Sequence, residues 1–401
     1  MLADGNLKNF TEGYWSVLTV LTLAHMMNHL YGGVVPPLLP IFRDMFTLSY
    51  SQLSLLVAMF NVGMMMQLLM GILSDRMGRR KVFAGLGLIL TSTLTLTLSL
   101  AFNYPLLLLN ILFLGIAAST YHPPSTTIIA EYFAEKGVEK AMGVHNIGES
   151  LGKALTSILL GIMIIYLTWQ TSLIILAIPG FFVGLAYLKI VKETGWRKSS
   201  KNLGLGFGGS KSLEKLDFRK ALSAIIILPV SGLTILTILD SFLVLYLVDA
   251  YNLEVSLAML VLGLLQLSGI VGGPLGGSLA YKFGKKRTIF GSVVGQVILL
   301  ILTVNLHPPL FMVISLIPVF GLLMYSFFAP ALTYLSEVAP GRFKATVYSF
   351  YFTFNFGWRG FTQILTGNLI NFYGFNFAFT FTAFLALTGI LLILFTLKEL
   401  K

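Results

Sequence analysis

The sequence has no cysteine and very little charge, and each shortage excludes a class of protein. Without Cys, the 401 residues cannot form disulfides or carry out thiol chemistry. Charged residues make up 11% of the chain and hydrophobic residues 56%, whereas an ordinary soluble domain is about 25% charged. Too little polar surface remains to face water on all sides, so we expect an integral membrane protein.

Long apolar runs organise the chain. A helix of about 20 apolar residues spans a hydrocarbon core of roughly 30 Å and satisfies its own backbone hydrogen bonds in lipid. Twelve runs of this kind occur, at 14–41, 51–73, 82–102, 106–130, 141–166, 171–190, 221–248, 255–277, 288–305, 310–335, 346–370 and 375–397. The predicted fold is therefore an all-α integral membrane protein with twelve transmembrane helices.

The net charge is +11, and the positions of the basic residues predict a topology. If the spans alternate from a cytoplasmic N-terminus, 24 of the 27 Lys and Arg residues are cytoplasmic, Arg43 is outside, and Lys153 and Arg359 are within spans. Cytoplasmic loops of membrane proteins carry such an excess of basic residues. We therefore expect a multi-pass plasma-membrane protein with both termini in the cytoplasm, whose basic loops contact membrane lipids and not nucleic acid.

The second half of the sequence repeats the first. Residues 71–81 (GILSDRMGRRK) align with 277–287 (GSLAYKFGKKR) at an offset of 206, which places Gly78 on Gly284. An even number of spans separates the two copies, so the halves share one orientation in the membrane. We predict two six-helix halves joined by a flexible cytoplasmic linker rich in Gly, Ser and Lys, with boundaries at 1–188, 189–220 and 221–401.

Three stretches resemble a known family. GILSDRMGRRK resembles the G-x-x-x-D-R-x-G-R-R signature of the major facilitator superfamily, and HMMNHLYGGVVPPLLP (25–40) and YHPPS (121–125) resemble its fosmidomycin-resistance-type efflux branch. The resemblance implies the major facilitator fold and a secondary active transporter that works by alternating access about a midplane site. For this branch it also implies efflux by proton antiport, of the kind that gives drug resistance. Where the branch is expected to have an acid in its first span, this chain has His29.

The glycines and charges of residues 71–81 predict a gate between the halves. Gly71 and Gly78 permit a tight turn, while Asp75 can accept hydrogen bonds from an Arg of its own loop and from a helix N-terminus in the other half. The alternative is a solvent-exposed loop whose basic residues only set the orientation of the protein in the membrane. It would explain the basic residues but not Asp75 or the glycines. The predicted gating residues are Gly71, Asp75, Arg76, Gly78, Arg79, Arg80 and Glu131, the last as a partner of Arg76 or Arg79.

Ionisable side chains inside the spans are expensive and usually line a polar path. At a rise of about 1.5 Å per residue, Glu149, Lys153 and Arg359 lie near the midplane. Asp240 is expected nearer the outer surface, and His145 nearer the inner one. We predict substrate contacts from His25, His29, Tyr31, Lys153, Trp358 and Arg359, and proton coupling through Glu149, His122, His145 and Asp240.

Several of these groups have a purely structural alternative. Glu149 and Lys153, at i and i+4 on one helix face, could simply neutralise each other. Arg359 could stay permanently paired with a carboxylate. His122 precedes two prolines and could bond a carbonyl that they free, and Asp240 could extend to interfacial water.

The cations suggest the class of substrate. Lys153 and Arg359 project from repeat-related spans, and Glu149 is the deep acid, so a protonated Glu149 would leave a positive site. We therefore expect a small amphiphilic organic anion, held chiefly by the Arg359 fork. The alternatives are a divalent-metal transporter that uses His25 and His29, which can chelate at i, i+4, and proton-coupled metabolite uptake.

Enzymatic activity and a bound cofactor are not expected. The sequence contains no phosphate-binding Walker loop, which also excludes ATP as the energy source, and no G-x-S-x-G or H-E-x-x-H pattern. The expected partners are a small-molecule substrate, protons and membrane lipids, and the expected state is a monomer.

The topology can be tested with reporter fusions. Because the basic residues concentrate on one side, a reporter fused after Lys201 should be cytoplasmic and one fused after Tyr104 should be external. Activity of a reporter on the other side of the membrane at either position would contradict this topology.

Overall fold

A computed structural model describes residues 4–134, 137–193, 218–339 and 344–396, and the secondary structure that it shows in them is helical. Most of the predicted linker, including Lys201, lies outside the described residues. The helices of the first half are α1 (Asp4–Gly32), α2 (Val35–Phe46), α3 (Tyr50–Met64), α4 (Gln67–Met77), α5 (Arg80–Leu98), α6 (Tyr104–Ser119), α7 (His122–Tyr132), α8 (Val138–Tyr166) and α9 (Trp169–Ile190). Those of the second half are α11 (Phe218–Leu228), the π-helical η1 (Pro229–Leu233), α12 (Thr234–Tyr251), α13 (Val255–Leu267), α14 (Gly269–Phe283), α15 (Lys285–Leu306), α16 (Leu310–Ser326), α17 (Phe328–Val338) and α18 (Lys344–Thr396).

The helices make up twelve spans, as predicted. Within the described residues, ten helices are long and apolar enough to cross a membrane, several of them formed by two successive elements such as α3 with α4. The longest, within α18, counts as two spans because Gly374 has a left-handed φ of 79° that ends one helix and begins the next. The N-terminal helix α1 completes the twelve.

The first span differs from its predicted range of 14–41. The helix α1 ends at Gly32, and the prolines that follow belong to a separate short helix, α2. Proline is well suited to the first turn of a helix, where its missing N–H is not needed, so the Pro36–Pro37 pair starts a new helix instead of extending the old one. The helix α2 packs on α3 and reaches α12 and α13 of the second half.

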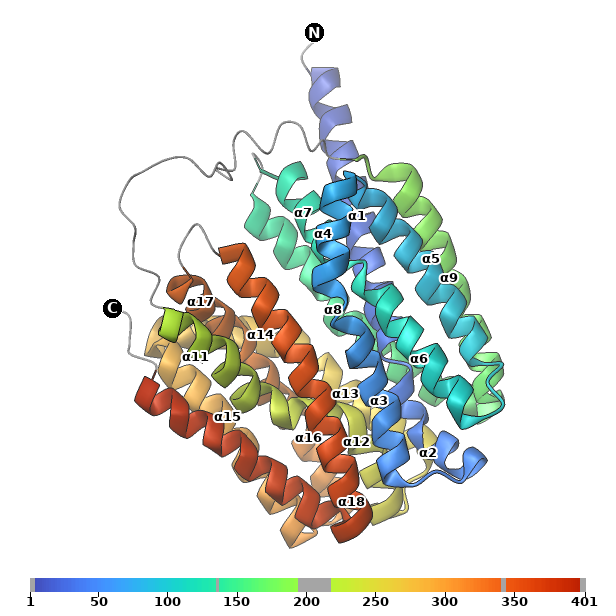
Figure 1. Cartoon of the computed structure of the whole chain (residues 1–401), viewed down its shortest axis with the longest axis vertical. Helices are drawn as coiled ribbons and strands as arrows, with labels where there is room; N and C mark the ends of the chain where they lie inside the picture. Colours follow the sequence, from blue (N-terminus) through green and yellow to red (C-terminus); the bar gives the residue numbers. More distant parts are fainter. Residues whose placement is uncertain (1–3, 135–136, 194–217, 340–343, 397–401) are drawn as a thin grey trace.

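The two halves lie against each other as two bundles (Figure 1). Their main contacts pair α3 with α18 and α8 with α13. We call the end of the molecule with the α4–α5 turn, close to the chain's N-terminus, the motif end, and the end with the α2–α3 turn the opposite end (Figure 1). The helices α3, α8, α13 and α18 therefore form the interface at which a site between the halves must lie.

Glycines bring α1 and α8 into close contact. A Cβ added at Gly148 would lie 2.7 Å from the Thr22 carbonyl oxygen, and one at Gly152 would lie 2.3 Å from the Met26 carbonyl oxygen. Small residues at such positions let two membrane helices approach through their backbones. This approach places the histidines of α1 beside the charged residues of α8.

The close approach of α1 and α8 predicts that Gly152 cannot be replaced by a larger residue without loss of stability. A Cβ there must push α1 and α8 apart, so Gly152→Ala should destabilise the fold by about 1–3 kcal/mol and lower its melting temperature in detergent. Gly143 of the same helix is the matched control, because an added Cβ meets nothing within 4 Å there. Equal melting temperatures for Gly152→Ala and Gly143→Ala would contradict the packing.

Candidate functional site

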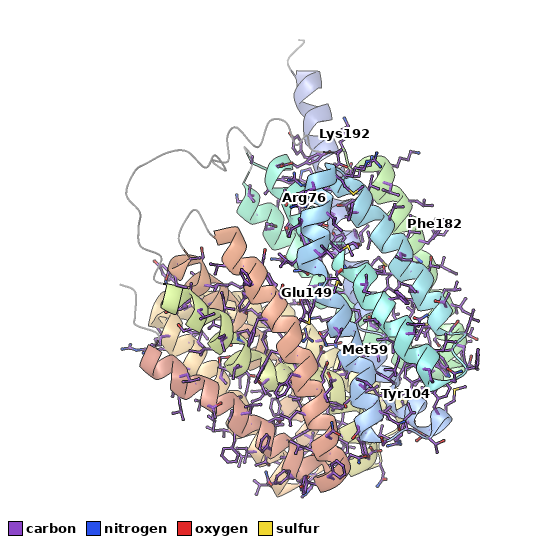
Figure 2. The ribbon with its side chains drawn as sticks, viewed as in Figure 1. Met59, Arg76, Tyr104, Glu149, Phe182 and Lys192 are labelled. Carbon is purple, nitrogen blue, oxygen red and sulfur yellow. The ribbon has the colours of Figure 1, made fainter. Side chains whose placement is uncertain are left out.

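One face of α8 carries three polar residues at successive turns: Glu149, Lys153 and Ser157. Lys153 Nζ donates to Glu149 Oε1 at 2.8 Å, and the Lys153 side chain is 12% exposed while that of Glu149 is 41% exposed. Figure 2 shows Glu149 between Arg76, near the motif end, and Tyr104, near the opposite end. The predicted pairing within the helix is therefore present, with Glu149 as its accessible member.

The second half presents its own charge pair. Arg359 of α18 lies 3.5 Å from the Asp240 carboxylate of α12, and the two side chains are 18% and 15% exposed. Asp240 was expected nearer the outer surface, and it lies closer to the Tyr251 end of the span Ala221–Tyr251 than to its beginning. The helix α12 continues to Tyr251, beyond the predicted end at residue 248, and this extension sets Asp240 about 16 Å from the helix end.

A glutamine connects the two halves at this level. Ser157 Oγ donates to Gln266 Oε1 at 2.9 Å, and Gln266 Nε2 donates to Asp240 Oδ1 at 2.8 Å. Lys153 also interacts electrostatically with Asp240 and Arg359 across the interface. The Asp240–Arg359 pair is therefore linked through Gln266 to Ser157 of α8, one turn beyond Lys153, so polar side chains of both halves meet at this level. Gln266 was not among the predicted site residues, although it interrupts the apolar run 255–277 with a polar side chain.

The Arg359 guanidinium retains a free donor. Its Nε atom is buried and has no hydrogen-bond partner among the described residues. A buried, unsatisfied N–H costs free energy, and an anionic ligand would remove that cost. Beside it, Trp358 Nε1 donates to Thr234 Oγ1 at 3.0 Å, just after the π-helical turn η1. The Trp358 ring stacks on Phe354.

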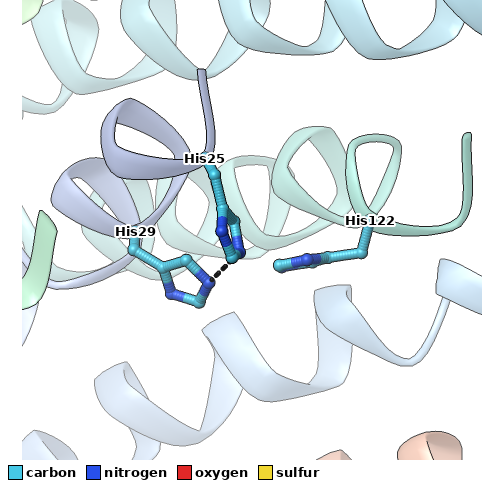
Figure 3. A group of neighbouring side chains, drawn as sticks. All are labelled: His25, His29 and His122. Atoms are coloured by element: carbon cyan, nitrogen blue, oxygen red, sulfur yellow. Dashed lines mark hydrogen bonds between the residues drawn. The ribbon is translucent and has the colours of Figure 1, made fainter. Parts of the chain in front are cut away.

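Four of the five histidines of the chain gather in the first half, next to Glu149. His25, His29 and His122 place one ring nitrogen each within 4.8 Å of one another (Figure 3). His25 Nδ1 lies 2.8 Å from the His145 carbonyl oxygen, and its Nε2 lies 3.1 Å from His29 Nε2. The His25 and His145 rings stack at 4.1 Å. His145 therefore lies beside His25, one turn nearer the beginning of α8 than Glu149, because the tight α1–α8 packing brings the two rings together.

Tyr31 lies elsewhere. Its side chain is fully buried, and its hydroxyl accepts from Gly180 N at 2.7 Å and contacts the Leu176 and Ala177 carbonyl oxygens at 3.0 and 3.1 Å. Tyr31 therefore joins α1 to α9 within the first half, and its hydroxyl is used in that contact.

Three of the predicted gating residues, Asp75, Arg80 and Glu131, form an ion-pair triad. Arg80 Nε donates to Asp75 at 2.6 Å, and its Nη1 donates to Glu131 at 2.8 Å. Glu131 was expected to pair with Arg76 or Arg79, but both of these side chains are exposed. Gly78 has a φ of 60°, which turns the chain so that Arg80 enters the first turn of α5 facing inward.

At the opposite end, a different set of residues joins the two halves. Arg43 pairs with Asp249, and Tyr50 Oη donates to Asp249 Oδ2 at 2.6 Å. Ser51 of α3 donates to Asn368 of α18 at 2.8 Å. None of these contacts was predicted from the sequence. Arg43, the single cation expected outside, could have indicated its ion pair with Asp249. Asp75 and Arg80 pair within the first half, whereas Arg43 and Asp249 pair between the halves.

Comparisons with known proteins accord with this architecture. The family model of the Major Facilitator Superfamily matches residues 21–363. The chain belongs to the major facilitator superfamily. A crystal structure of a bacterial homologue of the human lysosomal transporter Spinster, inward-facing and occupied, shares the fold of this superfamily member with a TM-score of 0.80 at 18% identity, over 96% of this chain and 97% of that one. The fold prediction of two six-helix repeats is confirmed.

Two relatives of this superfamily member carry informative names. The fosmidomycin resistance protein of Escherichia coli (strain K12) is 23% identical over 386 residues, which cover 94% of this chain and 92% of that protein. The hexuronate transporter of Bacillus subtilis (strain 168) is 24% identical over 185 residues, 46% of this chain and 44% of that protein. The chain is thus an MFS transporter, a multi-pass membrane protein of a family that is not enzymatic.

The contacts at the opposite end predict a conformational effect. Removing the Asp249 charge takes a partner from both Arg43 and Tyr50, so Asp249→Asn should shift the population towards a state open at the opposite end. Since the chain has no native Cys, Ser54→Cys can report this opening. Ser54 is fully buried against Gly367 of the other half, and its alkylation by a membrane-impermeant maleimide should become faster in the Asp249→Asn background.

Asp44→Asn is the matched control for this measurement. Asp44 pairs with the same Arg43 but belongs to the same half, so its loss should leave the alkylation rate nearly unchanged. Equal rates in the two backgrounds would contradict a role for Asp249 in holding the halves together.

Proposed function

We propose that this protein is a proton-coupled secondary transporter that moves a small amphiphilic organic anion across the plasma membrane by alternating access. The observation that carries the proposal is the pair of cations that the two halves bring to their interface, Lys153 and Arg359, each with a carboxylate partner. An anionic group bound between them would be held by both halves at once, which is how binding can favour one arrangement of the halves over another.

Arg359 is proposed as the main ligand of the anion. A guanidinium can hold a carboxylate or phosphonate through two parallel hydrogen bonds, and the Nε–H of Arg359 is unsatisfied. The aromatic surface of Trp358 and Phe354 suits the apolar part of an amphiphile. The names of two relatives agree with this class, because a hexuronate is a carboxylate and fosmidomycin is a phosphonate.

Proton coupling is proposed to act through Glu149 and Asp240. Glu149 is paired with Lys153 and Asp240 with Arg359, so neither cation is free to bind the anion. Protonation of a carboxylate would break its ion pair and free the cation. Proton and anion would then bind together and not in competition. His122 and His145 lie beside Glu149 and remain candidates for passing the proton to it.

The direction of transport has two candidates. The name of the fosmidomycin resistance protein supports efflux, with both termini and the motif end in the cytoplasm. The charge pairs support uptake as a second candidate, because a proton and an anion that bind together travel in the same direction down an inward proton gradient. The two directions predict opposite effects of pH on anion binding: acidification should strengthen binding for uptake with a proton and weaken it for efflux by antiport.

The proposal predicts how anion binding responds to Arg359. We expect calorimetric titration of the purified protein with fosmidomycin and glucuronate to show binding of at least one of them. Loss of a charged hydrogen-bond donor costs about 1.5–3 kcal/mol, so Arg359→Gln should bind it about 10- to 100-fold more weakly, with Arg359→Lys in between. Lys285→Gln, which removes a cation paired with Glu337 at the motif end, should bind normally.

The pH dependence of the same titration tests the coupling. Affinity for glucuronate, which stays ionised above about pH 5, should rise as the pH falls in the wild type and rise less in Glu149→Gln and Asp240→Asn. Binding that weakens on acidification would instead support proton competition and efflux by antiport. Binding of neither probe, or equal binding by all Arg359 variants, would contradict the anion site.

A further inference from the structure

We propose that His25, His29 and His122 form a binding site for one divalent transition-metal ion of the zinc or cobalt class, with ligands other than the two cations of the anion site. Three imidazoles from two segments of the chain, α1 and the start of α7, converge so that their ring nitrogens lie within 4.8 Å of one another (Figure 3). Imidazole nitrogen is a preferred ligand of such ions, and three histidines are sufficient to hold one with an open fourth position.

The hydrogen bonds of His25 prepare it to be a ligand. A carbonyl oxygen can only accept, so His25 Nδ1 carries the proton that is donated to the His145 carbonyl at 2.8 Å. In the neutral ring this leaves the lone pair on Nε2, the atom that faces His29. A metal-bound histidine almost always donates its second nitrogen in this way, which fixes both its tautomer and its orientation.

His29 provides the second nitrogen. Its Nε2 lies 3.1 Å from His25 Nε2, close to the roughly 3.3 Å that separates two nitrogens bound to one tetrahedral zinc ion. Without a metal, His29 Nε2 must donate a hydrogen to His25. When an ion binds, that hydrogen moves to Nδ1 of the same ring by tautomerisation, so both Nε2 lone pairs face the ion and no net proton is lost.

Access and charge also suit a cation. His25 is buried, but His29 and His122 are partly exposed, so an ion can reach the open side of the cluster. Glu149 acts electrostatically on His25 and His29, and its side chain is 41% exposed. This carboxylate can supply the negative charge that a dication needs, and an ion at the site would compete with Lys153 for it.

The site can be tested by metal titration alone. Purified protein, with any histidine tag removed, is titrated with Zn²⁺ in a calorimeter and with Co²⁺ while the visible absorption of the cobalt ion is recorded. We expect one ion per chain and a rise in melting temperature with the metal. His29→Gln and His122→Gln, which sit on different helices, should each weaken binding by more than about 10-fold.

His307→Gln is the matched control, because His307 is the remaining histidine of the chain and bonds Asn376 outside the cluster. Its metal binding should equal that of the wild type. Melting curves recorded without metal identify a variant that has not folded, in which case the variant on the other helix decides. Absence of stoichiometric binding in the wild type, unchanged binding in both cluster variants, or loss of binding in His307→Gln would overturn the site. None of these results depends on anion transport.

Discussion

The need to pair every charge inside the membrane determines the centre of this transporter. An unpaired ion in a low-dielectric interior costs several kcal/mol, so the deep cations Lys153 and Arg359 each lie against a carboxylate, Glu149 and Asp240. Gln266 then satisfies the remaining oxygen of Asp240. The positions of these side chains follow from this pairing more than from any preference of their helices.

The pairing also explains how the halves can move. Each deep ion pair lies within one half, Glu149–Lys153 in the first and Asp240–Arg359 in the second. The contacts that cross the interface at depth are neutral, such as those of Ser157 with Gln266 and of Asn61 with Gln363 at 2.8 Å. Among the described residues, a rocking motion would break neutral hydrogen bonds of this kind at the midplane. The ionic contact between the halves, Arg43 with Asp249, lies at the opposite end, where water can solvate both partners as they separate.

The sequence was sufficient for features that depend on local spacing. The length of apolar runs predicted twelve spans, and the i, i+4 spacing predicted the Glu149–Lys153 pair. Features that join distant segments could not be predicted in this way. The Asp240–Arg359 pair connects α12 to α18 across 119 positions of the sequence, so no local spacing indicates it. The role of Arg80, where Arg76 or Arg79 was expected, depends on the left-handed conformation of Gly78.

In the proposed mechanism, the same charge balance links selection of an anion to proton coupling. The sequence suggested a site with two cations and one deep acid, which becomes clearly positive when Glu149 takes up a proton. With Asp240 beside Arg359 the four groups sum to zero, so an anion gains a free cation only when a carboxylate is neutralised. A site of this kind does not need a separate device for coupling. In this mechanism, protonation of a carboxylate is the step that frees a cation for the anion. A substitution of either carboxylate should therefore alter anion affinity and proton coupling together.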